Sequence, residues 1–163
     1  MEAYPLAPLL KVREYRENAA KNALRAAERA VSEAREDVER CREELERYKV
    51  WRLEEADRRY GAIMGKALSL KELDAFKAGL GVLADGELRR EEAIAAALAE
   101  VKKREAAVLK AREDARLAQH ETSKILAHRD IWLEQARREA ERREDLEMEE
   151  FKTAPPQDTE SEE

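Results

Sequence analysis

The stretch AKNALRAAERAVSEAREDVERCREELERY, residues 20–48, decides the fold of this chain of 163 residues. Its apolar residues recur at alternating steps of four and three, and no position in that series is charged. The series comprises Ala20, Leu24, Ala27, Val31, Ala34, Val38, Cys41, Leu45 and Tyr48. A heptad pattern of this length predicts one helix of a coiled coil, in which the series forms the seam that packs against a partner helix.

The composition of the whole chain agrees with this pattern. Charged residues make up 43% of the sequence, compared with roughly 25% in average domains. Only 5% of the residues are aromatic, and Ala, Glu, Lys, Arg and Leu predominate, as in long helices and coiled coils. A compact domain of this length needs more bulky apolar residues to offset its chain entropy, so an enzyme with a deep pocket is disfavoured.

The positions of proline and glycine set the helix boundaries. All four prolines lie near the ends, at positions 5, 8, 155 and 156, and all five glycines lie between positions 61 and 86. Because Gly costs about 1 kcal/mol and Pro about 3 kcal/mol inside a helix, two uninterrupted helices are predicted. The first spans about residues 8–64 and the second about 69–151, so that residues 1–151 form a single helical hairpin. Residues 152–163 are expected to be a disordered acidic tail.

The turn between the helices is predicted at residues 65–68. It is followed by SLKE, residues 69–72, which fits a capping box that begins a helix. A short turn makes the two helices antiparallel, so the predicted fold is all-α, a long antiparallel two-helix coiled-coil hairpin in which residue i faces about position 134 − i. Gly79, Gly81 and Gly86 fall near the start of the second helix. We favour one continuous helix with a weak start; a restart at residues 85–87 is the alternative.

Further seam positions follow from the same periodicity. Beyond Tyr48 the apolar stripe of the first helix is expected to shift by one position, to Leu53, Ala56, Tyr60 and Ile63. The seam of the second helix is expected to comprise Leu73, Phe76, Leu80, Leu83, Ile94, Val101, Val108, Ala111, Ala115, Ala118, Ile125 and Trp132, interrupted by Thr122 and Arg129. Because the second helix is longer, a segment near residues 126–151 is expected to overhang the N-terminal end without a partner inside the chain.

The sequence offers no catalytic or metal-binding motif. His120 and His128 point in different directions on a helix and have no further ligand nearby, and Cys41 lies on the seam without a paired base. The glycines do not form a phosphate-binding loop. We therefore predict a protein that is not an enzyme and needs no cofactor.

Targeting signals are equally scarce. The longest apolar run, residues 93–99, is far shorter than the roughly 20 residues that span a bilayer, and the N-terminus does not resemble a signal peptide. The single cysteine, Cys41, fits a reducing compartment. The expected location is the cytoplasm, with no membrane insertion.

Charge argues against nucleic-acid binding. Pairs such as Arg58-Arg59 and Arg137-Arg138 lie among glutamates, and the acidic residues are concentrated after position 143. A nearly neutral body with an acidic end lacks the basic face that phosphate binding requires. Two tryptophans, Trp51 and Trp132, have two interpretations: they fill the seam at its thicker ends, or they are exposed anchors for a partner protein.

Five segments resemble the YscO family of bacterial type III secretion proteins. They are residues 12–17 (VREYRE), 48–55 (YKVWRLEE), 71–76 (KELDAF), 83–87 (Leu-x-x-x-Glu) and 144–151 (EDLEMEEF). The most particular is the Tyr-x-x-Trp-Arg segment. The order and spacing of the five segments carry the resemblance, which covers essentially the whole chain to Phe151. This family is similar to the flagellar export protein FliJ and to the γ subunit of rotary ATP synthases.

The resemblance implies a central stalk in the pore of a hexameric export ATPase, at the inner-membrane secretion apparatus. The stalk is expected to promote assembly or activity of the ATPase, to couple it to an export gate protein and to escort secretion chaperones. By analogy with the γ subunit, residues 6–16 with 125–144 enter the ring and the turn near residues 61–73 meets the gate. The candidate partner-binding residues are Leu9, Val12, Arg13, Arg16, Trp51, Arg52, Phe76, Trp132, Arg137, Arg138, Glu144, Asp145 and Phe151.

Two other functions fit the composition. A generic structural coiled coil, for example a dimer that buries a second face, explains the periodicity equally well, but leaves the tryptophan-containing segments and the unequal helices unexplained. A nucleic-acid-associated or ribosome-associated coiled coil predicts salt-sensitive binding, which the charge balance disfavours.

Overall fold

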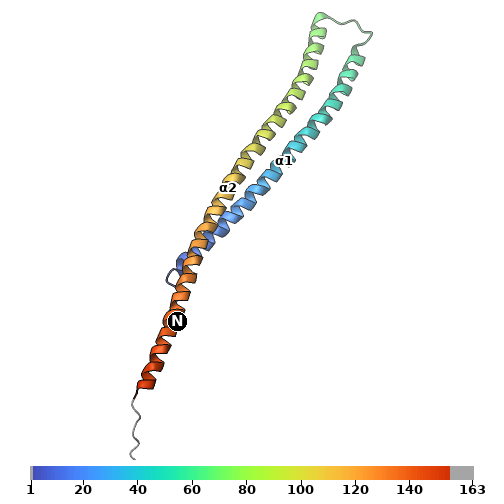
Figure 1. Cartoon of the computed structure of the whole chain (residues 1–163). Helices are drawn as coiled ribbons and strands as arrows, with labels where there is room; N and C mark the ends of the chain where they lie inside the picture. The colour runs from blue at the N-terminus through green and yellow to red at the C-terminus, as the bar shows by residue number, and fades with distance from the viewer. Residues whose placement is uncertain (1, 155–163) are drawn as a thin grey trace, which may run out of the picture. The chain divides into compact units, whose positions relative to one another are not determined.

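The computed structural model describes residues 2–154 and contains two long helices, α1 (Ala7–Ile63) and α2 (Leu70–Thr153) (Figure 1). The predicted all-α, two-helix hairpin is confirmed. Three of the four helix ends differ from prediction by one residue, and α2 extends two residues further, so Lys152 and Thr153 are helical rather than part of a tail. Of the rest of the predicted tail, Ala154 follows the end of α2, and residues 155–163 lie outside the described residues.

The chain divides into two compact units, which are described separately. The hairpin unit is residues 20–114 and contains the turn. The terminal unit combines residues up to position 19 with residues from position 115 onward. Each unit therefore pairs a part of α1 with a part of α2.

The turn of the hairpin unit begins with a glycine in the left-handed region. Gly65 has a φ of 74°, a conformation that an L side chain rarely adopts. The Lys66 amide donates a hydrogen bond to the Ile63 carbonyl at 3.2 Å, which satisfies an acceptor at the end of α1. Gly65 therefore ends α1, and the turn includes the predicted residues 65–68.

The start of α2 is the predicted capping box. The Glu72 amide donates to the Ser69 hydroxyl at 3.2 Å, and the Ser69 amide donates to the Glu72 carboxylate at 3.3 Å. Two backbone donors that lack a helical acceptor are thereby satisfied. From Leu70 onward α2 continues without a break through Gly79 and Gly86, so the alternative of a restart at residues 85–87 is wrong.

The seam of residues 20–48 is confirmed at every position. All nine side chains are buried or half-buried; Val31, Ala34, Val38 and Leu45 are the most enclosed, with Leu83 and Val108 contributed by α2. Cross-helix contacts follow the predicted pairing of residue i with about 134 − i, since Arg104 Nη1 donates to the Ala30 carbonyl at 2.9 Å. The hydrophobic core of the hairpin unit therefore consists of one row of small and branched side chains from each helix.

The predicted shift of the α1 seam after Tyr48 is confirmed at two of its four positions, since Ala56 and Ile63 are half-buried. It is wrong at the other two, because Leu53 is 68% exposed and Tyr60 is 50% exposed.

Arg52, Glu55 and Arg59 also turn inward, and they continue the heptad steps of four and three without a shift. Ion pairs of Arg52 with Glu87 and of Glu55 with Arg58 and Arg59 offset part of the desolvation cost of these charges, which would be larger without a partner. Near the turn, the inward positions of α1 therefore carry both charged and apolar side chains.

The predicted seam of α2 is confirmed. Each of its twelve apolar positions is buried or half-buried, and the interrupting residues Thr122 and Arg129 also turn inward. The Thr122 hydroxyl donates to the Ala118 carbonyl at 3.1 Å, which satisfies this buried polar group within its own helix.

The terminal unit is built around Leu10, Ala115 and Thr122, which are all buried. The residues before α1 also cover α2, because the Tyr4 hydroxyl lies 2.6 Å from Nδ1 of His128. The predicted overhang from about residue 126 is therefore too long. All side chains of α2 are exposed only from Arg137 onward.

Candidate functional site

Tyr48 lies at the centre of a contact cluster in the hairpin unit. Its hydroxyl donates a hydrogen bond to the Leu83 carbonyl at 2.7 Å. The guanidinium carbon of Arg90 lies 3.9 Å from the centre of the Tyr48 ring, and Arg90 Nη1 donates to the Gly86 carbonyl at 2.9 Å. The cation–π contact and the two hydrogen bonds fix the Tyr48 ring against the backbone of α2.

Trp51 extends this cluster to the surface. Its ring centre lies 5.5 Å from that of Tyr48, and the side chain is 47% exposed. A shallow depression beside it is lined by Glu44, Arg47, Tyr48, Trp51 and Arg90. The side chain packs against Tyr48 and is also partly exposed, and its role as an anchor for a partner stays a prediction. An exposed Trp beside Arg is the composition of an interaction hot spot.

Arg52 and Glu55 are charged residues of α1 that turn inward nearer the turn. Arg52 makes an ion pair with Glu87 of α2. The Glu55 carboxylate accepts hydrogen bonds from Arg58 at 2.6 Å and from Arg59 at 3.0 Å, and these bonds hold its pKa below the ordinary value of 4.5. Arg52 is thus engaged within the hairpin unit and helps to hold α1 and α2 together there.

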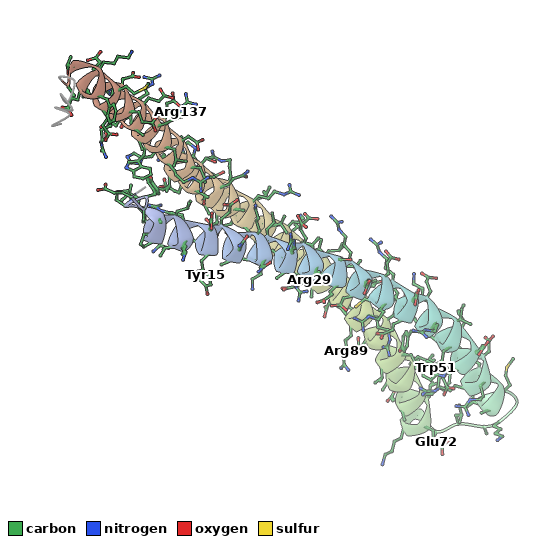
Figure 2. The ribbon with its side chains drawn as sticks, turned by 90° about the horizontal axis from the view of Figure 1, so that it is seen from below. Tyr15, Arg29, Trp51, Glu72, Arg89 and Arg137 are labelled. Carbon is green, nitrogen blue, oxygen red and sulfur yellow. The ribbon has the colours of Figure 1, made fainter. Side chains whose placement is uncertain are left out.

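Phe76 packs inside the hairpin unit close to the turn. Its ring meets the Tyr60 ring edge-on with the centres 5.0 Å apart. The side chain is half-buried, so only part of it is available to another molecule. The two ribbons of the hairpin unit diverge towards the turn in Figure 1, and Figure 2 draws side chains in the space between them there.

The first three turns of α1 carry four of the candidate residues. Leu9, Val12 and Arg16 are exposed, whereas Arg13 pairs with Glu121 of α2 at 2.7 Å. The pKa of Glu121 is lowered by its hydrogen bond to Lys124 and, to a smaller extent, by the charge of Arg13. Tyr15, which projects outward from α1 in Figure 2, is also exposed. This surface combines an internal ion pair with an open apolar flank.

Trp132 is half-buried in the terminal unit. Its ring centre lies 5.5 Å from that of Tyr4 and the two planes are tilted by 59°. The predicted partner of Trp132, near position 2, is confirmed by a depression that Glu2 and Trp132 both line. Tyr4 therefore ties the first residues of the chain to α2 through two aromatic neighbours.

The end of α2 presents the remaining five candidates on one exposed helix. Arg137 and Arg138 both pair with Glu134, at 3.3 Å and 3.2 Å, without leaving the helix. Glu144, Asp145 and Phe151 are exposed, and Phe151 is exposed to 90%. This segment, residues 137–154, is called the α2 extension below.

The thirteen candidates therefore fall into three groups rather than one site. The first comprises Trp51 and Arg52 of the hairpin unit, with Phe76 nearer the turn. The second is the start of α1 together with Trp132 of the terminal unit, and the third is the α2 extension. Sequence reasoning missed Tyr4, Gly86 and Arg90 as contact residues. Gly86 could have been found from the sequence, because the rule that residue i faces about position 134 − i places Gly86 opposite Tyr48. Within residues 2–154 there is no group of three or more potential metal ligands, and no helix is apolar over a membrane-spanning length.

Comparison with known proteins identifies the family. The family model for type III secretion protein YscO matches residues 6–154. No curated protein matches the chain in sequence. The crystal structure of the type III secretion protein YscO from Vibrio parahaemolyticus is similar in fold, with a TM-score of 0.81 and 22% identity, covering 90% of this chain and 92% of that one.

A second solved structure supports the same fold. A protein of Chlamydia trachomatis described as a YscO homologue has a TM-score of 0.70 and 20% identity, with 93% of each chain covered. The family match extends over almost all of the described residues, including both helices and the α2 extension. The chain belongs to the YscO family of type III secretion proteins.

Proposed function

We propose that this protein is the non-enzymatic central stalk of a type III secretion apparatus. In this role it binds the hexameric export ATPase in the cytoplasm, at the inner-membrane apparatus, and promotes assembly or activity of the ring. The family supports a role in type III secretion. The finer role rests on the resemblance to rotary stalk proteins, on the antiparallel helix pair and on the surfaces described above.

The observation that carries the proposal is the α2 extension. All of its described side chains are exposed, and its ion pairs and hydrogen bonds connect residues of α2 to each other. Single helices in water are marginal unless an apolar face is packed, and this one leaves Leu146, Met148 and Phe151 open. A binding partner that covers these residues would stabilise it.

Charge suggests the character of that partner. The segment that surrounds Phe151 carries Glu144, Asp145, Glu147, Glu149 and Glu150 and a single basic residue, Lys152. An acidic helix with exposed apolar side chains is complementary to a basic, partly apolar channel. Complementary charge favours fast and specific association more than raw affinity. We therefore assign the terminal unit to the ATPase ring and the turn of the hairpin unit to the export gate, while the Trp51 surface is available to secretion chaperones.

ATP hydrolysis by the export ATPase of the same secretion system tests the proposal. Addition of the full chain is expected to increase hydrolysis and to shift the ATPase towards the hexamer. The double variant Glu144→Lys with Asp145→Lys and the variant Phe151→Ala are expected to lose most of this effect. Both change exposed side chains, so helicity measured by circular dichroism is expected to remain unchanged.

A matched variant at the other end of the molecule decides the orientation. Lys66→Glu lies in the turn and is expected to stimulate the ATPase like the unmodified chain, while secretion in the bacterium is reduced. If the turn variant loses stimulation and the α2 extension variants keep it, the proposed orientation is reversed. If the unmodified chain neither binds the ATPase nor changes its activity, the stalk function is rejected and a structural coiled coil remains.

A further inference from the structure

Two arginines of the terminal unit turn inward, and each has a side-chain nitrogen that is closed off from solvent. They are Arg13 of α1 and Arg129 of α2. Both side chains are half-buried, and in both the Nε atom is enclosed and has no hydrogen-bond partner. An enclosed N–H donor without an acceptor destabilises a folded chain, because it has lost its hydrogen bond to water.

The charge of Arg13 is paired within the chain. Its Nη1 atom lies 2.7 Å from Oε2 of Glu121 and forms an ion pair between α1 and α2. This contact offsets part of the cost of turning a guanidinium group inward. Arg13 therefore has a structural role, which is to link the two helices.

Arg129 has no such contact, since within residues 2–154 it makes no hydrogen bond or ion pair. The pairing of residue i with about 134 − i, which the ion pair of Arg13 follows, places position 5 opposite Arg129. Residues 3–7 (AYPLA) contain no carboxylate. Every side chain one turn away from Arg129 on α2 is also apolar. These neighbours are Ile125, Leu126, Trp132 and Leu133.

An apolar residue at position 129 would serve the fold better than arginine. Arg129 interrupts the apolar seam of α2, and a methionine there would cover the same neighbours without an enclosed donor or a charge. Replacing inward charged groups by apolar side chains of similar size often stabilises a protein. Arg129 thus lowers stability without an internal contact that compensates for it, which is the pattern expected of a residue kept for function.

The charged end of Arg129 is accessible from outside. Only its Nε atom is enclosed, whereas the two Nη atoms, which also lack a partner, remain open to solvent. Leu133, one turn further along α2, is 41% exposed, and Leu126, one turn before, is half-buried. Apolar neighbours of this kind exclude water from a central polar contact when another protein covers them.

We propose that Arg129 binds a carboxylate of the protein that receives the terminal unit. This inference rests on the function proposed above, in which that protein is the export ATPase, and it adds the chemistry of one contact. The two Nη atoms of a guanidinium match the two oxygens of an Asp or Glu side chain. A polyanion such as nucleic acid fits less well, because the five acidic residues between positions 144 and 150 would repel it.

The contact also gives the receiving channel a charge pattern. The acidic segment that begins at Glu144 requires basic groups, whereas Arg129 requires an acidic group. At 1.5 Å per residue these two positions on α2 are about 22 Å apart along the helix. Two contacts of opposite sign at a fixed spacing determine how deeply the terminal unit enters the channel, because a shifted position brings like charges together.

Thermal unfolding of the full chain by itself measures the cost assigned to Arg129. Arg129→Met is expected to raise the melting temperature by about 2–4 °C, whereas Arg13→Met is expected to lower it because Glu121 loses its partner on α1. Arg112→Met is the matched control, since Arg112 is exposed in the hairpin unit and also makes no ion pair within the described chain. If Arg129→Met lowers the melting temperature as Arg13→Met does, Arg129 has a structural role and the proposal is overturned.

Calorimetric titration of the export ATPase with the full chain measures the contact itself. Arg129→Met and Arg129→Glu are expected to weaken binding by at least about tenfold, Arg129→Lys is expected to weaken it less, and Arg112→Met is expected to bind normally. Single changes of acidic pore residues of the ATPase to Arg are expected to include one that restores binding of Arg129→Glu.

The outcomes separate this contact from the stalk function. If the unmodified chain binds the ATPase and Arg129→Met binds equally well, only the contact of Arg129 is overturned. If Arg129→Glu binds weakly and no change in the pore restores binding, the carboxylate partner is overturned. If the unmodified chain does not bind the ATPase at all, the stalk function fails and the contact fails with it.

Discussion

The hydroxyl group of Tyr48 occupies the space over Gly86 in which a side chain at that position would lie. From there it donates its hydrogen bond to the Leu83 carbonyl, and Arg90 covers the other side of the ring. The glycine is thus explained by a side chain on the opposite helix. Glycine at position 86 lowers the helix propensity of α2, but it leaves the space that the bulky Tyr48 side chain occupies in the seam.

Gly86→Ala is therefore expected to destabilise the protein, although an alanine in a helix interior normally stabilises it. Overpacking costs about 1–3 kcal/mol, and the displaced Tyr48 hydroxyl loses its acceptor as well. Thermal unfolding followed by circular dichroism measures the effect. Gly81→Ala is the matched control, because its new methyl group points into open space, and it is expected to raise stability by up to about 1 kcal/mol. Equal melting temperatures for the two variants would contradict the role assigned to Tyr48.

The heptad pattern of the sequence was sufficient to predict most of the fold. Over residues 20–48 the seam is apolar without exception, so periodicity and burial coincide. After Tyr48 the two signals conflict: Leu53 and Tyr60 continue the hydrophobicity, whereas Arg52, Glu55 and Arg59 continue the heptad. The structure turns Arg52, Glu55 and Arg59 inward, where ion pairs satisfy their charges, and it also half-buries Ala56 and Ile63. A single sequence does not show which ion-pair partners will be available, so its apolar residues alone predict a shift.

The candidate interaction residues were harder to predict for a related reason. How many side chains near the start of α1 and the end of α2 are exposed depends on how far the residues before Ala7 extend along α2. The contact between Tyr4 and Trp132 shows that they extend as far as Trp132. Tyr4 lies in the irregular segment before α1, where no helical periodicity in the sequence could predict a contact. The α2 extension is therefore shorter than helix lengths alone suggested, and it begins at Arg137 rather than near Leu126.

Leu45→Lys and Val38→Lys test the apolar seam. Leu45 is only 8% exposed, and the new ammonium group would enter a core two residues thick without a prepared partner. A loss of at least about 3 kcal/mol is expected, of the order seen when large buried side chains are removed. Urea unfolding measures it. Leu109→Lys, at a position that is 66% exposed in the same unit, is the control and is expected to change stability little. Unchanged unfolding of Leu45→Lys would show that this position is not in the seam.

Ala34→Leu tests how closely the two helices approach. Ala34 is 1% exposed, the lowest value in the core, and lies in the seam between the two helices. Three additional heavy atoms have no space there, so a loss of about 1–3 kcal/mol is expected even though Leu is a good helix former and more hydrophobic. Ala106→Leu, at an exposed position of α2, is expected to be neutral in the same unfolding assay. A stabilised Ala34→Leu protein would indicate that the helices separate easily at this level.

Glu55 makes the hairpin unit sensitive to acid. Hydrogen bonds from Arg58 and Arg59 lower the pKa of its carboxyl below the ordinary value of 4.5, which also governs the unfolded chain. A group whose pKa is lowered by folding stabilises the folded state above the unfolded pKa, and this contribution disappears as the pH falls through the folded pKa. Glu55→Gln is therefore expected to lower the melting temperature at neutral pH and to melt like the unmodified protein well below pH 4.5. Glu46→Gln, which changes an exposed residue, is expected to have little effect at either pH. A difference between Glu55→Gln and the unmodified protein that persists undiminished in acid would mean that Glu55 acts through its packing and not through its charge.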